Sequence, residues 1–270
     1  MADIRIDENV MVAKTSGREL RVDLFHPPEG RGAATGVLFF PGGGFRTANR
    51  GGLRERYGLR LAEKGFVFVA AEYRVMDEAP WPAQILDSKT MIRWVRANSA
   101  GLGIDPARIV SGGASAGGLL ALLAAGTQDV LEFEGTEGTN PSVSSEVAAV
   151  IGLYPVTDMT EWGRRPGQEK LFGQNPSTSL LEAATPIHYV NPGYPPTMLI
   201  HGMADQLVSH SKTMRMYQAL ERAGVPVDLH LYAGQDHIFD RDPELGAAVT
   251  DAIALFISRY VPSQDPLAAG

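Results

Sequence analysis

The segment that most constrains the fold is 108–123, where an apolar run leads to a serine between glycines and then to a leucine-rich run. The central residues are Gly113-Ala114-Ser115-Ala116-Gly117. This order predicts a strand, a sharp turn and a helix, the context in which a G-x-S-x-G element presents a nucleophilic serine. Glycines two positions before and after Ser115 allow a tight turn without Cβ clashes and leave the hydroxyl exposed at the end of the strand.

Strand patterns recur along the whole chain. Several are continuous apolar runs, which is typical of strands buried on both faces of a mostly parallel sheet. The run at 20–26 alternates more and favours an antiparallel strand near the edge. The predicted strands are 10–14, 20–26, 36–40, 66–73, 108–111, 148–153, 197–201 and 227–232.

Helical patterns fall between these strands, which predicts βαβ units in a doubly wound α/β sheet of eight strands with helices on both faces. The predicted helices are 53–64, 83–98, 116–125, 209–223 and 243–260. With no repeat or long linker, residues 1–270 are expected to form a single domain. Segment 127–146 is expected to be a surface loop, and the long segment 155–196 a cap or lid over a site.

A serine nucleophile needs a base, and the base needs an acid that fixes its tautomer. Sheets with this elbow bring the three groups in the order serine, acid, histidine. Asp205 follows the predicted strand 197–201, and His237 follows the strand 227–232. The carboxyl ends of strands are where open α/β sheets assemble their sites. We therefore predict Ser115, Asp205 and His237 as the catalytic residues.

Other groups compete for these roles. Asp236 is a rival acid, although a residue adjacent to the base rarely reaches the same imidazole nitrogen. His201 closes a strand and is expected to support the Asp205 loop by hydrogen bonding. The remaining histidines are expected to be surface or packing residues, or to break the required order: His26, His188, His210 and His230.

Three consecutive glycines, 42–44, directly follow the predicted strand 36–40. Such a loop allows close approach of the backbone to a ligand. The amides of Gly43 and Gly44, with that of Ala116 after the nucleophile, are the expected oxyanion hole. Phe45 and Trp162 are candidate walls of the substrate pocket, although either aromatic could equally be packing.

Composition narrows the functions further. The chain has 24 Lys and Arg against 31 Asp and Glu, a net charge of −7, and lacks the basic stripe of a nucleic-acid-binding protein. Without cysteine it has no disulfide, catalytic thiolate or cysteine-bound metal. Neither a P-loop nor a metal-ligand spacing occurs, so no cofactor or metal is expected. A polar N-terminus and the absence of a membrane-length apolar run favour a cytoplasmic protein without a membrane partner.

The chain resembles the branch of the α/β-hydrolase superfamily that includes hormone-sensitive-lipase-like and acetyl/feruloyl-esterase-like serine esterases. The resemblance extends from about residue 10 to residue 260. It rests on these motifs: Gly42-Gly43-Gly44-Phe45, Tyr73-Arg74, Ala79-Pro80-Trp81-Pro82-Ala83, Gly103-Ile104-Asp105-Pro106, Gly113-Ala114-Ser115-Ala116-Gly117-Gly118, Pro195-Pro196, His201-Gly202-Met203-Ala204-Asp205-Gln206-Leu207-Val208 and His237-Ile238-Phe239.

Two positions depart from the family pattern. Pro41 stands where the family usually has a histidine before the glycines, so the loop must be held differently. Ala114 replaces the usual Asp or His before the nucleophile. Any cap must come from 155–196, which favours an open site.

The resemblance implies a serine carboxylic-ester hydrolase that acts on short-acyl esters through an acyl-enzyme. The alternatives are a carbohydrate acetyl or feruloyl esterase or an aryl formamidase with the same triad, and, from another class, a non-catalytic small-molecule receptor. A peptidase is disfavoured, because no gating domain precedes the catalytic one. The expected partner is a small-molecule ester, and a homodimer stays an open alternative.

Overall fold

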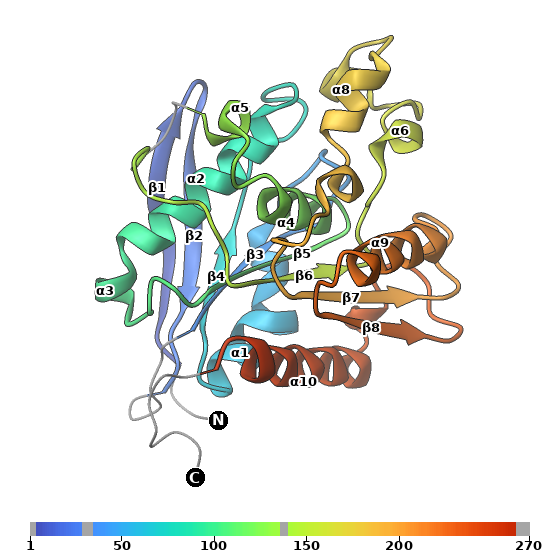
Figure 1. Cartoon of the computed structure of the whole chain (residues 1–270). Helices are drawn as coiled ribbons and strands as arrows, with labels where there is room; N and C mark the ends of the chain where they lie inside the picture. Colours follow the sequence, from blue (N-terminus) through green and yellow to red (C-terminus); the bar gives the residue numbers. More distant parts are fainter. Residues whose placement is uncertain (1–3, 29–34, 136–139, 263–270) are drawn as a thin grey trace.

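The computed structural model describes residues 4–28, 35–135 and 140–262. One eight-stranded sheet runs through it in the order β1-β2-β4-β3-β5-β6-β7-β8 (Figure 1). The strands are β1 (Ile6–Thr15), β2 (Arg18–Phe25), β3 (Gly36–Phe40), β4 (Val67–Ala71), β5 (Ile109–Ala114), β6 (Ala149–Leu153), β7 (Thr197–Gly202) and β8 (Val227–Tyr232).

The pairing explains the two kinds of sequence pattern. From β4 to β8 all neighbours are parallel, and β3 to β7 are buried along their whole length, as their continuous apolar runs predicted. β2 pairs antiparallel with both β1 and β4, next to the sheet edge. The predicted mostly parallel α/β sheet with an antiparallel edge is confirmed.

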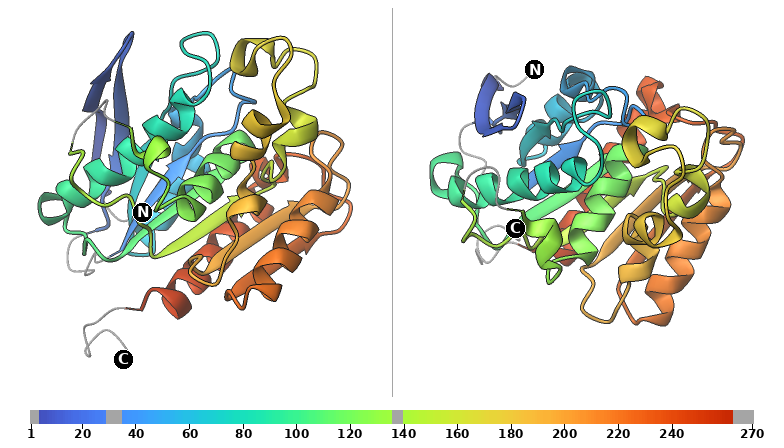
Figure 2. Two further views of the ribbon diagram at one scale, coloured as in Figure 1. Left: turned by 45° about the horizontal axis from the view of Figure 1, so that its top comes forward. Right: turned by 90° about the horizontal axis from the view of Figure 1, so that it is seen from above.

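Helices cover both faces of the sheet (Figures 1 and 2). One core contains apolar residues of α2 (Ala83–Ala97), α4 (Ala116–Gly126) and α9 (His210–Arg222). The core on the other face contains residues of α1 (Leu59–Glu63) and α10 (Pro243–Tyr260). The helix α10 begins as predicted, with the Asp242 side chain capping the amides of Glu244 and Leu245.

The predicted helix at 53–64 differs from the structure. It consists of a 3-10 turn η1 (Arg50–Leu53), a π-helical segment η2 (Arg54–Gly58) and α1. An apolar pattern does not distinguish these helix types. In the wider π turn, Arg56 and Tyr57 both contact Asp240 of the 3-10 turn η4 (Phe239–Arg241), a contact distant in sequence.

The two irregular segments contain short helices that the sequence did not indicate. A turn of helix, α5 (Leu131–Glu134), lies within 127–146, of which residues 136–139 are outside the described part. Segment 155–196 contains α6 (Met159–Trp162), α7 (Glu169–Phe172), α8 (Thr178–Ala183) and η3 (Pro186–Tyr189). The small helix α3 (Ser99–Leu102) extends the end of α2.

No helix among the described residues has the length and apolar character needed to cross a membrane.

Candidate active site

Ser115 lies at the sharp turn between β5 and α4. Its backbone has φ 53° and ψ −117°, a region that residues other than glycine rarely adopt. A Cβ on Gly113 would lie 2.2 Å from the Gly117 carbonyl oxygen, and one on Gly117 would lie 2.2 Å from the Phe40 carbonyl oxygen. The flanking glycines are therefore required by the close approach of three backbone segments.

The structure brings Ser115, His237 and Asp205 into one hydrogen-bonded line. His237 Nε2 is 3.1 Å from Ser115 Oγ, and His237 Nδ1 is 2.6 Å from Asp205 Oδ2. Because the carboxylate accepts from Nδ1–H, the neutral imidazole presents an unprotonated Nε2 to the serine hydroxyl. This arrangement can move a proton from Ser115 to His237.

Asp205 is held by four donors. Its Oδ1 accepts from the amides of Leu207 and Val208, both at 2.8 Å. Its Oδ2 accepts from His237 and from His201 Nε2, the latter at 3.0 Å. Burial alone raises the pKa of Asp205, but hydrogen bonds from His201, His237 and Val208 outweigh burial and hold that pKa well below its usual range. The carboxylate thus stays ionised beside the imidazole.

His201 has the supporting role that its position predicted. It is fully buried, and its Nδ1 lies 2.7 Å from the Thr213 hydroxyl while its Nε2 faces Asp205 and the Val208 carbonyl. Asp236 has a different task from the acid of the triad. Its Oδ1 accepts from the amides of Gln206 and His237, which links the loops that follow β7 and β8.

Tyr154 supports the imidazole from the side, a contact that the sequence did not reveal. Its ring lies 4.6 Å from the His237 ring, centroid to centroid, in an edge-on arrangement. Its hydroxyl donates to Asp240 Oδ1 at 2.7 Å, and the Tyr57 hydroxyl donates to Oδ2 of the same carboxylate. Burial, and then the charge of Asp240, raise the pKa of Tyr154 well above its usual value, so this hydroxyl remains a donor.

The glycine loop after β3 lies directly over the nucleophile. A Cβ on Gly42 would lie 3.3 Å from Ser115 Cβ. Gly43 and Gly44 have positive φ values of 143° and 58°, and a Cβ on Gly43 would lie 2.2 Å from the Thr47 carbonyl oxygen. A side chain at position 43 would therefore displace the backbone, so this position requires glycine.

Two hydrogen bonds hold this loop, in which Pro41 stands at the position where the resemblance led us to expect a histidine. The Tyr73 hydroxyl donates to the Pro41 carbonyl at 3.0 Å, and the Met76 amide donates to the Phe45 carbonyl at 2.8 Å. Ala116, whose amide completes the predicted oxyanion hole, is the first residue of α4, where backbone N–H groups have no partner within the helix.

A cavity of about 400 Å³ opens onto Ser115 and His237. Trp162 of α6 lines it, as predicted. The prediction for Phe45 needs correction, because its side chain is fully buried against the Tyr73 ring and is absent from the described cavity lining. Its backbone has a positive φ of 64°, and the chain turns here so that the ring enters the core.

The cavity lining also contains three arginines that the sequence reading missed: Arg46, Arg56 and Arg241. Arg46 and Arg241 lie close in sequence to the glycine loop and to His237, which was an available signal, whereas Arg56 lies within η2 and had none. Among the described residues no cluster of three or more His, Cys, Asp or Glu could hold a metal ion.

Comparison with known proteins places this geometry in a family. The BD-FAE family model matches residues 22–220. Esterase LipQ of Mycobacterium tuberculosis (strain H37Rv) is 32% identical over 260 residues, an alignment that covers 90% of this chain and 61% of LipQ. The chain thus spans about three fifths of the length of the curated relatives it matches.

Two solved structures match over nearly the whole length of both chains. The thermophilic esterase Est2 of Thermogutta terrifontis superposes with a TM-score of 0.80 and 26% identity, covering 98% of this chain and 94% of Est2. A truncated carbohydrate esterase from gut microbiota has a TM-score of 0.81 and 25% identity, covering 95% of this chain and 96% of that one. With the nucleophile elbow and the sheet order described above, these matches show that the chain belongs to the BD-FAE family of α/β-hydrolase esterases.

Proposed function

We propose that the protein is a serine carboxylic-ester hydrolase that acts on short-acyl esters through an acyl-enzyme. The observation that carries the proposal is the continuous hydrogen-bonded line from Asp205 through His237 to Ser115, at the floor of an open cavity. Est2, which is similar over nearly the whole chain, has been solved with propionate and with butyrate bound. This likeness supports a preference for small acyl groups.

The chemistry follows from the positions of these groups. Ser115 Oγ attacks the ester carbonyl carbon while its proton passes to His237 Nε2, and Asp205 stabilises the imidazolium that forms. The amides of Gly43, Gly44 and Ala116 donate to the developing oxyanion. His237 then gives its proton to the leaving alcohol. In the second half-reaction His237 takes a proton from water, which attacks the acyl carbonyl carbon, and the proton passes to Ser115 Oγ as its bond to the acyl group breaks and the carboxylic acid leaves.

We further propose that residues 155–196 act as a cap on a single domain. Two contacts support this proposal: Trp162 lines the cavity, and the Gly167 carbonyl accepts a hydrogen bond from Arg46 beside the glycine loop. The small size of the segment is consistent with an open site that admits varied alcohols.

The test is hydrolysis of p-nitrophenyl esters from acetate to decanoate by the wild type and by Ser115→Ala. We expect the highest kcat/KM on the short chains and a loss in the variant of about 10⁴-fold or more. Activity that survives in Ser115→Ala contradicts the assigned nucleophile. Maximal activity on decanoate contradicts the short-acyl preference. An acetylated sugar, assayed beside these esters, tests the carbohydrate esterase alternative, which the gut-microbiota structure makes the second candidate: a much higher kcat/KM on that sugar than on p-nitrophenyl acetate favours it.

A further inference from the structure

The cavity above Ser115 is positively charged, although the whole chain has a net charge of −7. Arg46, Arg56 and Arg241 reach it from the loop after β3, from η2 and from η4. Within the described part of the chain, no Asp or Glu side chain lines this cavity. Since a cleft lined by one sign of charge concentrates ligands of the opposite sign, the cavity favours anions.

The three guanidinium groups differ in how far protein groups already balance their charge. Arg56 Nη1 lies 3.3 Å from Asp240 Oδ2, which places a buried carboxylate beside it. Arg46 donates from Nη2 to the neutral Gly167 carbonyl at 3.2 Å, and the exposed Glu169 interacts with it electrostatically.

Arg241 is the least satisfied of the three. It is exposed at the end of η4, four residues after His237, and its side chain has no hydrogen bond or ion pair with another described residue. A ligand anion would therefore meet Arg241 and Arg46 without competing with an ion pair inside the protein.

A guanidinium group suits oxyanion ligands. Its planar fork of N–H donors matches anions such as a carboxylate, to which it forms short, charge-assisted hydrogen bonds. Thr47 and Asn49, which also line the cavity, add neutral polar groups to the same wall. Apolar acyl groups would make no use of any of these side chains.

We propose that the cavity selects esters that carry an ionised carboxylate as a second acid group, bound by Arg241 and Arg46. This inference rests on the proposed esterase function, because it concerns the substrate of the same site. The carboxylate lies either on the acyl side, as in the half-ester of a dicarboxylic acid, or on the alcohol side, as in an acylated hydroxybenzoate. Both share the chemistry that the arginines recognise, and the substrates below separate them.

Two matched substrate pairs test the proposal at pH 7.5, where the carboxylates are ionised. Monoethyl glutarate against ethyl pentanoate tests the acyl side, and 4-acetoxybenzoate against its methyl ester tests the alcohol side. Each kcat/KM is divided by the rate constant of that ester with hydroxide, which removes the difference in intrinsic reactivity. We expect at least one pair to favour the anionic ester by about tenfold, as one partly exposed charge-assisted contact provides.

Variants then assign the preference to residues. Arg241→Glu reverses the charge and is expected to abolish the preference or invert it, mainly through a higher KM for the anionic ester. Arg46→Gln is expected to reduce the preference several-fold. Arg222→Gln removes one positive charge at the exposed end of α9, which precedes the start of β8, whereas His237 follows the end of that strand, and this variant should keep the wild-type ratio. In the wild type, 0.5 M NaCl should lower the ratio, because salt screens exposed charges.

The outcomes separate this inference from the proposed function. Equal normalised rates for the anionic and neutral members of both pairs overturn the inference and leave the esterase intact. A preference that persists in both Arg241→Glu and Arg46→Gln also overturns it, because other groups then bind the carboxylate. Failure to hydrolyse every ester, including p-nitrophenyl acetate, contradicts the proposed function itself.

Discussion

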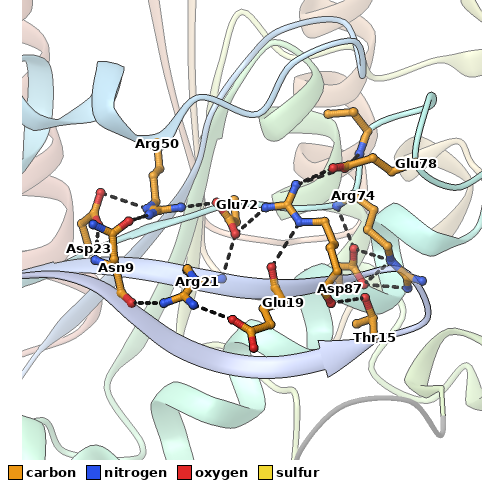
Figure 3. A network of polar contacts seen from close by, with 12 residues as sticks. Asn9, Thr15, Glu19, Arg21, Asp23, Arg50, Glu72, Arg74, Glu78 and Asp87 are labelled. Carbon is orange, nitrogen blue, oxygen red and sulfur yellow. Dashed lines mark hydrogen bonds and ion pairs between the residues drawn. The ribbon is translucent and has the colours of Figure 1, made fainter.

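Arginines cluster in two regions of this molecule. In one region they form ion pairs with carboxylates, and in the other two of the three do not. At the β1–β2 edge of the sheet, arginines and carboxylates alternate in one network (Figure 3). The buried Glu72 pairs with both Arg18 and Arg50, and the almost fully buried Arg74 and Asp87 pair at 2.8 Å. In the cavity, by contrast, neither Arg46 nor Arg241 forms an ion pair with a carboxylate among the described residues, and Arg46 has only an electrostatic interaction with the exposed Glu169.

We infer from this difference that the paired arginines stabilise the fold and that the cavity arginines bind substrate. A buried guanidinium is already bound by its carboxylate, so the network attaches the hairpin β1–β2 to the end of β4 and to η1, which begins at Arg50. A guanidinium that faces a cavity without such a partner contributes little to folding and remains available to a substrate. Variants in the two regions should therefore change different measurements.

The largest expected effect is on turnover at the cavity. Asp205→Asn should lower kcat/KM for p-nitrophenyl acetate by roughly 10³- to 10⁴-fold, because an amide can hold His237 in the wrong tautomer. Steady-state kinetics at pH 7.5 would measure this loss. A reduction of less than tenfold would point to another acid, and Asp236→Asn, made in parallel, would show whether the neighbouring carboxylate has that role.

A substitution in the network at the β1–β2 edge should lower the stability of the fold rather than the turnover. Glu72→Gln leaves Arg18 and Arg50 partly uncompensated near a buried position and should lower the free energy of unfolding by about 3 kcal/mol. Urea unfolding would measure this change, with Glu182→Gln on the exposed surface of α8 as the charge-matched control. An unfolding free energy equal to that of the control would contradict the division between the two regions.

A smaller effect concerns pH and the carboxylate of Asp205, which contacts the cavity residue His237. The folded-state pKa of Asp205 lies below its ordinary unfolded value of about 4. Its ionisation therefore stabilises the folded protein above pH 4, and this contribution is lost as the pH falls through the folded-state pKa. The Tm difference between the wild type and Asp205→Asn should be larger at pH 7 than at pH 3. A difference that is constant or grows toward acid would contradict the direction of this shift.

The smallest expected effect completes the comparison. Arg241→Gln should change the free energy of unfolding by no more than about 0.5 kcal/mol, because its exposed side chain contacts no described partner. The same urea titration provides the measurement. A loss near that of Glu72→Gln would mean that Arg241 has a structural role.

The strands of the sheet were predicted well because a buried strand has a recognisable apolar pattern in its own short stretch of sequence. Each of the eight predicted strands overlaps one observed strand, since runs such as 36–40 and 148–153 need no distant information. The residues 115, 205 and 237 were found for a similar reason: each directly follows a strand in a set order, and the structure brings them together.

What sequence reasoning missed depends on contacts between distant segments. Tyr154 and Tyr57 meet at Asp240, and no local pattern indicates that meeting. Phe45 and Arg46 are neighbours, yet a positive φ at Phe45 sends its ring into the core while Arg46 faces the cavity. The three cavity arginines, 46, 56 and 241, converge only through the fold.

The four donors that hold Asp205 orient its carboxylate before catalysis begins. Both oxygens of that carboxylate already accept two hydrogen bonds each, so the group has no free direction in which to rotate. Charge that appears on His237 during acylation, and again during deacylation, meets an acceptor that is already oriented. In the proposed mechanism, folding rather than each turnover supplies this alignment, and the reorganisation energy of both half-reactions is correspondingly small.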